Sequence, residues 1–101
     1  MTHYFLKLIP PRPTFAQDLT PDEAALMQAH AVYWHGMLER GLAAAFGLVG
    51  DPAGAYGVGI IEIEDGADVH ALAAQDPTIL ANVGFKYEIH PMPRAVTRAR
   101  R

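Results

Sequence analysis

The 101-residue sequence predicts an α+β fold of four strands and two helices in the order β-α-β-β-α-β. Three observations favour this order. Two stretches have the apolar spacing of helices, a Gly- and Pro-containing turn joins two apolar runs between them, and a strand-like run lies near each end. The order is that of a split βαβ repeat, which is typical of a ferredoxin-like antiparallel sheet with both helices on one face. The predicted strands are His3–Ile9, Leu42–Val49, Tyr56–Glu64 and Lys86–His90.

The first helix is the longest one that the sequence predicts, within the stretch from Thr20 to Gly41. Thr20 suits the N-cap, Pro21 suits the first helical position, and Glu23 completes a T-x-x-E capping box. Gly41 is a natural residue just beyond the helix end, because glycine readily takes the left-handed conformation found there. These local signals agree with one another and predict both ends of the helix.

One face of this helix carries an apolar stripe that includes a histidine. The stripe follows the 3.6-residue helical period and consists of Leu26, His30, Tyr33 and Met37. A buried imidazole needs a polar partner, because its loss of hydration is otherwise uncompensated. Asp76 interrupts the apolar face of the second helix in a similar way, and we expect it to be that partner.

The second helix is predicted to begin after Asp65, the expected N-cap, and to end at Asp76, because proline follows at position 77. Val69, Leu72 and Asp76 share one face of it. Asp76 is also a good N-cap for a further turn that begins at Pro77. A carboxylate has two acceptor oxygens, so capping and pairing with His30 are compatible.

The connection between the first strand and the first helix, Pro10–Leu19, contains three prolines and is predicted to lack regular structure. It is longer than the usual ~2–6 residues, and long loops are often functional. Arg12 and Phe15 are therefore candidates for the rim of a site. The alternative, which we favour, is a solvent-exposed loop with Phe15 held against the surface.

Composition excludes several classes of function. The formal charge of −3 gives no reason to expect nucleic-acid binding, and no apolar run approaches the ~20 residues of a membrane-spanning helix. No signal peptide is recognised, and we expect a cytoplasmic protein. The sequence contains neither cysteine nor serine, so disulfides, thiolate metal sites and covalent acyl chemistry by either nucleophile are excluded.

A His–Asp dyad of His30 and Asp76 would have the base and the orienting group of a catalytic triad without the nucleophile. Asp76 would fix the tautomer of His30 and leave the second ring nitrogen free as a general base or acid. Such a pair can catalyse proton abstraction, elimination or isomerisation. The alternative is a purely structural pair, which is the more common role of a lone histidine on an apolar face.

The other histidines do not have the spacing of a metal site. His35 follows His30 by five residues and lies about 140° around the helix, whereas a spacing of four residues suits chelation. His3, His70 and His90 are scattered over other predicted elements. We expect no metal and no cofactor.

Both faces of the predicted sheet are apolar. The Leu42–Val49 strand has no polar residue and is expected to be buried, and Ile60 and Ile61 point to opposite faces. An uncovered apolar face of the order of several hundred Å² is unusual on a monomer, so we expect a homodimer with its sheets packed face to face. Residues 1–93 are expected to form the domain, and residues 94–101, with four arginines, a flexible basic tail.

Short motifs over nearly the whole chain resemble those of the YCII-related (YciI-like) domain family. They are His30 with Gly41 ending its helix, Tyr33-Trp34, the Gly47–Gly54 turn region, Gln75-Asp76-Pro77 and Tyr87–Met92. The resemblance implies a ferredoxin-like protein of the dimeric α+β barrel superfamily, akin to muconolactone isomerases and small cofactor-free monooxygenases. It also implies an active site made of His30 and Asp76. One departure is Gly47-Leu48, where many relatives have Gly-Pro.

The sequence and this resemblance together predict a cofactor-independent lyase or isomerase that acts on a small aromatic or carboxylated molecule. His30 would move the proton and Asp76 would orient it. Tyr33 or Trp34 would line an apolar wall, and Arg12 would bind an anion. One alternative is a non-catalytic dimeric ligand-binding or accessory module of the same fold. Another is monooxygenase chemistry, which the sequence does not distinguish from lyase or isomerase chemistry.

Overall fold

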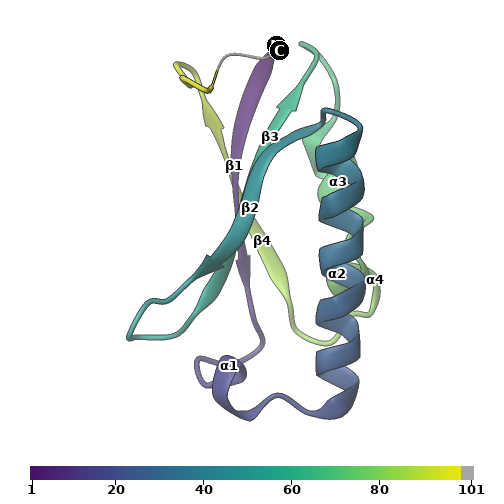
Figure 1. Cartoon of the computed structure of the whole chain (residues 1–101), viewed down its shortest axis with the longest axis vertical. Coiled ribbons are helices and arrows are strands. Elements are labelled where there is room, and N and C mark those ends of the chain that lie inside the picture. The colour runs from purple at the N-terminus through teal and green to yellow at the C-terminus, as the bar shows by residue number, and fades with distance from the viewer. Residues whose placement is uncertain (99–101) are drawn as a thin grey trace.

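The computed structural model describes residues 1–98, and its four strands form one antiparallel sheet in the order β2-β3-β1-β4 (Figure 1). This order and the helical connections confirm the predicted ferredoxin-like α+β fold. The strands are β1 (Thr2–Ile9), β2 (Ala43–Val49), β3 (Tyr56–Ile63) and β4 (Lys86–Met92). The helices are α1 (Phe15–Asp18), α2 (Pro21–Glu39), α3 (Val69–Ala74) and α4 (Pro77–Leu80).

The long helix α2 and the short helices α3 and α4 stand on the same side of the sheet (Figure 1). The core lies between these helices and the central strands, where Leu6 and Ile61 meet Trp34 and Met37. Gly59 on β3 lies directly beneath the Trp34 ring, and a Cβ at this position would come within 2.2 Å of a ring carbon. The glycine therefore allows the indole to approach the sheet backbone.

Helix α2 begins as its sequence predicts. The hydroxyl of Thr20 accepts a hydrogen bond from the Glu23 amide at 3.2 Å, and the Glu23 carboxylate accepts one from the Thr20 amide at 2.9 Å. The buried residues of α2 are His30, Trp34 and Met37, whereas Tyr33 is only half-buried. The buried stripe is thus turned slightly from the predicted one, because the gap above Gly59 accepts Trp34.

The predicted start of the second helix is wrong. Asp68, and not Asp65, caps α3, since its carboxylate accepts hydrogen bonds from the two backbone amides at positions 70 and 71. Asp65 instead accepts a hydrogen bond from the hydroxyl of Thr2 at 2.6 Å. Beyond α3 the chain resets at Asp76, and Pro77 opens α4, as expected of a residue that suits a first helical turn.

The prediction that residues 10–19 lack regular structure is also wrong, because α1 forms there. The three prolines that suggested an irregular loop all precede α1 and leave its backbone amides intact. Phe15, at the start of α1, is buried and meets Phe85 edge to face with ring centroids 5.2 Å apart. Phe15 therefore belongs to the core, whereas residues 13, 14 and 16–19 of this segment are exposed.

The second strand is not buried as predicted. β2 lies at the edge of the sheet and pairs only with β3, so most of its residues are exposed, including Leu48 at 70 %. The face of the sheet opposite the helices carries the half-buried side chains of Phe5, Val58 and Ile60. We call this the open sheet face.

Residues 95–98 of the predicted tail line a cavity together with Ile60 and Glu62 of β3. The rest of the tail, residues 99–101, lies outside the described residues. The domain boundary expected at residue 93 stays a prediction. None of the helices in the described part of the chain combines the length and apolar character that a membrane crossing requires.

Candidate functional site

The side chains of His30 and Asp76 meet between the helices. Helix α2 presents His30 toward α4, and Asp76 occupies the N-cap of α4. Asp76 Oδ2 lies 2.7 Å from His30 Nδ1, and Asp76 Oδ1 accepts a hydrogen bond from the Thr78 amide at 2.9 Å. Asp76 thus caps α4 with one oxygen and meets the imidazole with the other.

Asp76 is completely buried, and hydrogen-bond donors surround its carboxylate. Tyr87 donates to Oδ2 at 2.5 Å and Trp34 Nε1 donates to the same oxygen at 3.2 Å, while the Thr78 hydroxyl donates to Oδ1 at 2.8 Å. We call His30, Trp34, Asp76, Thr78 and Tyr87 the Asp76 cluster. Its members come from α2, α4 and the start of β4, so the cluster joins three elements that are distant in sequence.

These donors decide the charge of Asp76. Burial by itself raises the pKa of a carboxyl group, but the hydrogen bonds from His30 and Tyr87 outweigh it and the pKa of Asp76 is lowered. Asp76 is therefore an ionised acceptor at neutral pH. We accordingly assign the proton of the His30–Asp76 hydrogen bond to Nδ1, which leaves a lone pair on Nε2 when the ring is neutral.

His30 Nε2 reaches solvent. The described residues offer this nitrogen no hydrogen bond, yet none of the buried side-chain nitrogen or oxygen atoms in residues 1–98 lacks a partner. Nε2 is therefore not completely buried, in a side chain that is 11 % exposed. One ring nitrogen is fixed by a buried carboxylate, and the other is accessible from outside.

Tyr87 and Thr78 are members of the cluster that the sequence reasoning missed. Burial and the charge of Asp76 raise the pKa of Tyr87, which therefore stays a protonated donor, and its oxygen also accepts from Trp34 Nε1 at 3.0 Å. Tyr87 lies in the predicted strand Lys86–His90, and a tyrosine buried beneath helices usually needs a partner for its hydroxyl. This requirement is a sequence signal for a polar group in this part of the core.

Tyr33, expected in the wall of the site, lies beside the cluster and not in it. Its hydroxyl donates to the Leu72 carbonyl at 2.5 Å and so ties α2 to α3. Burial and the charge of Asp76 raise the pKa of Tyr33. Trp34, the other residue expected there, is 2 % exposed and serves as a donor within the cluster.

Arg12, expected to bind an anion, is already paired with carboxylates. Its guanidinium donates to both oxygens of Glu23 at 2.8 Å and to Asp18 at 2.8 Å. The hydrogen bonds from Arg12 and from the Thr20 amide lower the pKa of Glu23 to about 2. Arg12 therefore fastens the α1 segment to the start of α2, and we leave it out of the proposed site.

An apolar cavity of about 220 Å³ lies near the cluster, between α1, the first half of α2 and the sheet. Met27 in its wall precedes His30 by three residues, which places the two on neighbouring turns of one helix face. Leu8, also in the wall, is the cross-strand neighbour of Tyr87. The cavity and the Asp76 cluster are thus adjacent on both α2 and the sheet.

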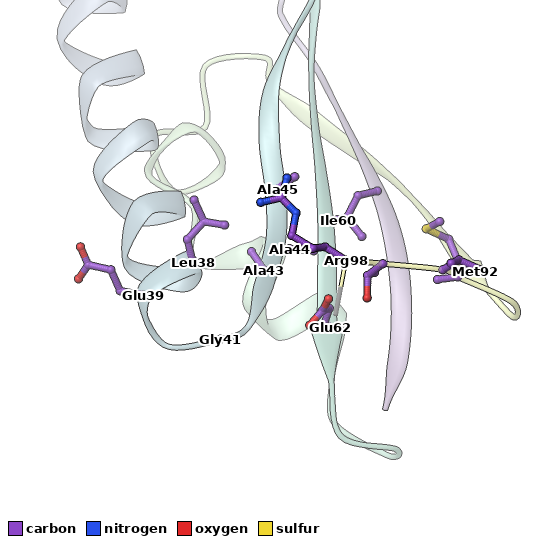
Figure 2. Close-up of a pocket in the computed structure, with 13 residues that line it drawn as sticks. Leu38, Glu39, Gly41, Ala43, Ala44, Ala45, Ile60, Glu62, Met92 and Arg98 are labelled. Atoms are coloured by element: carbon purple, nitrogen blue, oxygen red, sulfur yellow. The ribbon is translucent and has the colours of Figure 1, made fainter. Parts of the chain in front are cut away.

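A larger cavity, about 740 Å³, lies elsewhere. Figure 2 shows it between Leu38 and Glu39 near the end of α2, Ile60 and Glu62 on β3, and Arg98. Its lining within residues 1–98 includes no member of the Asp76 cluster. The smaller apolar cavity is the better candidate for a substrate site, because Met27 and Leu8 in its wall are neighbours of His30 and Tyr87.

Potential metal ligands are not clustered in the described residues. Within residues 1–98, no group of three or more His, Asp and Glu side chains is arranged to hold a metal ion. The His30–Asp76 pair has two members of this kind, and its other neighbours are Trp34, Thr78 and Tyr87. These neighbours act toward Asp76 as hydrogen-bond donors.

The fold and the cluster define a class of protein, a ferredoxin-like α+β domain with a histidine–carboxylate pair buried between its helices. The model of the YCII-related domain family matches residues 4–93, and the chain belongs to this family. The match confirms the family that the sequence motifs indicated, and it spans the whole Asp76 cluster. A search of the curated proteins found no match.

Proposed function

We propose that this YCII-related protein is a cofactor-independent enzyme of the lyase or isomerase type, which moves a proton on a small molecule. The observation that supports the proposal most is the asymmetry of His30, whose Nδ1 is held by Asp76 at 2.7 Å while Nε2 reaches solvent. A general base needs one ring nitrogen held and the other presented to substrate. His30 has this arrangement, and the sequence contains no serine or cysteine to act as a nucleophile beside it.

In the proposed reaction Nε2 of His30 removes a proton from an acidic C–H group of the substrate. The imidazolium that forms is stabilised by the ionised Asp76 carboxylate, which the Thr78 and Tyr87 donors keep in place. Return of the proton to another atom completes an isomerisation, and loss of a leaving group completes an elimination. General base catalysis of this kind contributes roughly 10²–10⁴-fold to a rate.

Deuterium incorporation tests the proposal without knowledge of the natural substrate. The protein is incubated in D₂O with a panel of cyclic ketones and lactones, and exchange of their acidic C–H groups is followed by proton NMR. We expect the wild type to accelerate exchange for at least one compound and His30→Gln to lose about 100-fold or more of that acceleration. His35→Gln is the matched control, because His35 is an exposed histidine on another face of α2. Equal rates for wild type and His30→Gln would contradict the proposal.

A second candidate is a non-catalytic ligand-binding or accessory module. It is favoured by the low exposure of His30, 9 % for the whole residue, and by the walls of the two cavities above, whose residues within 1–98 do not include His30. In this case His30 only stabilises the fold. His30→Asn should then lower the unfolding temperature and leave every exchange rate unchanged, whereas loss of exchange from a stable variant favours the enzyme.

We also propose that the protein is a homodimer that packs through the open sheet face. The helices α2, α3 and α4 cover the other face (Figure 1). Phe5, Val58 and Ile60 present apolar surface on the open sheet face. Burial of such a face in a twofold dimer removes it from water. Sedimentation should show a dimer at micromolar concentration, and Val58→Lys should shift it to monomer. A wild-type monomer at that concentration would rule the dimer out.

A further inference from the structure

We propose that the apolar cavity binds a neutral molecule with a single aromatic ring, and that this molecule is the substrate class of the enzyme. The binding part stands on the cavity alone, and the substrate part rests on the proposed function. The wall of the cavity includes Leu8, Phe15, Met27, Leu48, Gly57 and Phe85.

The size of the cavity sets the size of the ligand. Its volume is about 220 Å³, and an apolar protein cavity of about 150 Å³ holds one benzene molecule. One ring with one or two small substituents therefore fills the space, whereas two fused rings with substituents exceed it. Gly57 contributes to this space because it has no side chain, and a Cβ there would lie 3.2 Å from the Cβ of Leu8.

The apolar side chains of the cavity wall favour a neutral ligand. The side chains that line the cavity within residues 1–98 are hydrocarbon, thioether or aromatic, and the hydroxyl of Tyr56 is the polar exception. Neither Arg12 nor Lys7 lines the cavity. Arg12 pairs with two carboxylates, and the Lys7 ammonium lies 4.4 Å from the centroid of the Tyr56 ring. A carboxylate in this cavity would lose hydration and find no cation in the described wall, with the Tyr56 hydroxyl as its one polar neighbour among the lining residues, which disfavours it.

The aromatic groups of the wall favour a planar ring. Phe15 and Phe85 meet at an interplanar angle of 83°, so a ring that enters the cavity can contact the face of one and the edge of the other. Leu48 and Leu19 line the same cavity and are exposed at 70 % and 36 %. Two exposed leucines beside an apolar cavity form a mouth through which an apolar molecule enters.

The position of Met27 links the cavity to His30. The two residues are three apart on α2, so His30 lies about 4.5 Å farther along the helix axis and on the same face. A substituent on a bound ring that extends past Met27 therefore approaches His30. The ring would supply binding energy in the cavity, and the reacting C–H group would be carried on the substituent.

The test is a titration of the ¹⁵N-labelled full chain with 4-methylphenol and with 4-methylbenzoate, two probes of similar shape but different charge at neutral pH. We expect 4-methylphenol to shift the amide resonances of Met27 and Gly57, with 4-methylbenzoate at least tenfold weaker. Ala16→Leu adds bulk to the wall and should weaken binding at least fivefold. Ala25→Leu, at an exposed position of α2 outside the wall, is its matched control and should leave binding unchanged.

The outcomes separate the two proposals. Equal affinity for both probes, or 4-methylphenol binding that Ala16→Leu leaves intact, overturns the cavity assignment whatever the activity. His30→Gln should keep 4-methylphenol affinity within twofold, because His30 is outside the wall. Deuterium exchange into the methylene group of 4-hydroxyphenylacetone that depends on His30 and is inhibited by 4-methylphenol supports the substrate assignment. Exchange that 4-methylphenol does not inhibit overturns it while the binding site stands.

Discussion

Replacing Tyr87 by phenylalanine removes one hydroxyl from the Asp76 cluster and nothing else. This hydroxyl donates a 2.5 Å hydrogen bond to a buried, ionised carboxylate and accepts one from Trp34 Nε1 at 3.0 Å, and both are lost. Hydrogen bonds to charged groups contribute about 1.5–3 kcal/mol, so we expect the free energy of unfolding to fall by this amount at neutral pH. The Trp34 hydrogen bond to Asp76 remains, which limits the loss.

Tyr33→Phe is a matched control for this prediction. Tyr33 is also a half-buried tyrosine whose hydroxyl donates at 2.5 Å, but its acceptor is the neutral carbonyl of Leu72. Hydrogen bonds between neutral groups contribute about 0.5–1.5 kcal/mol, so Tyr87→Phe should cost about 1 kcal/mol more than Tyr33→Phe. Urea denaturation of both variants, at one protein concentration and followed by circular dichroism, measures this difference.

The charge of Asp76 also makes the difference depend on pH. When Asp76 is protonated, Tyr87 no longer donates to an anion, and the two variants should converge in acid. Equal destabilisation by the two variants at neutral pH, or a gap that persists unchanged in acid, would refute the reasoning. Either result would mean that the carboxylate is not held ionised by its donors.

Two further predictions concern the same region. Because folding lowers the pKa of Asp76 from 3.8, its ionised form contributes stability that is complete above that value and is lost as pH falls through the folded pKa. The urea midpoint of Asp76→Asn should therefore change less with acid than that of the wild type between about pH 5 and 1. Parallel curves of urea midpoint against pH would contradict this prediction. Gly59→Ala should destabilise the core by about 1–3 kcal/mol or more, because its Cβ would meet the Trp34 ring at 2.2 Å, whereas Gly36→Ala, with no atom within 4 Å, should be neutral or stabilising in thermal unfolding. Equal unfolding temperatures for these two glycine variants would show that the Trp34 ring moves aside at little cost.

The features that were predictable from the sequence are those with local causes. The caps of α2 depend on residues within one turn, and the element order follows from periodicity. His30 and Asp76 were predictable as candidate site residues because each is a polar residue on an otherwise apolar helix face. The His30–Asp76 contact joins residues 46 positions apart. It could be predicted because both predicted helices were expected on the same face of the sheet.

The features that were missed depend on contacts between distant segments. Asp65 and Asp68 are equally good N-caps by type, and the choice between them involves Thr2, 63 residues away from Asp65. Whether Tyr33 or Trp34 enters the core depends on the space above Gly59 of β3. The sequence of α2 alone does not indicate the space that Gly59 leaves on β3.

The Asp76 cluster also has a consequence for how the protein unfolds. Its donors come from α2, α4 and β4. Detaching α2 or β4 leaves the buried anion short of partners, and detaching α4, which Asp76 caps, separates the anion from the donors on α2 and β4. An ionised carboxylate in that position is so unfavourable that partly opened forms are sparsely populated. The three elements should therefore exchange their amide hydrogens through a common opening event, with one free energy for segments that are far apart along the chain. A polar contact at the centre of the domain acts in this way as a source of cooperativity.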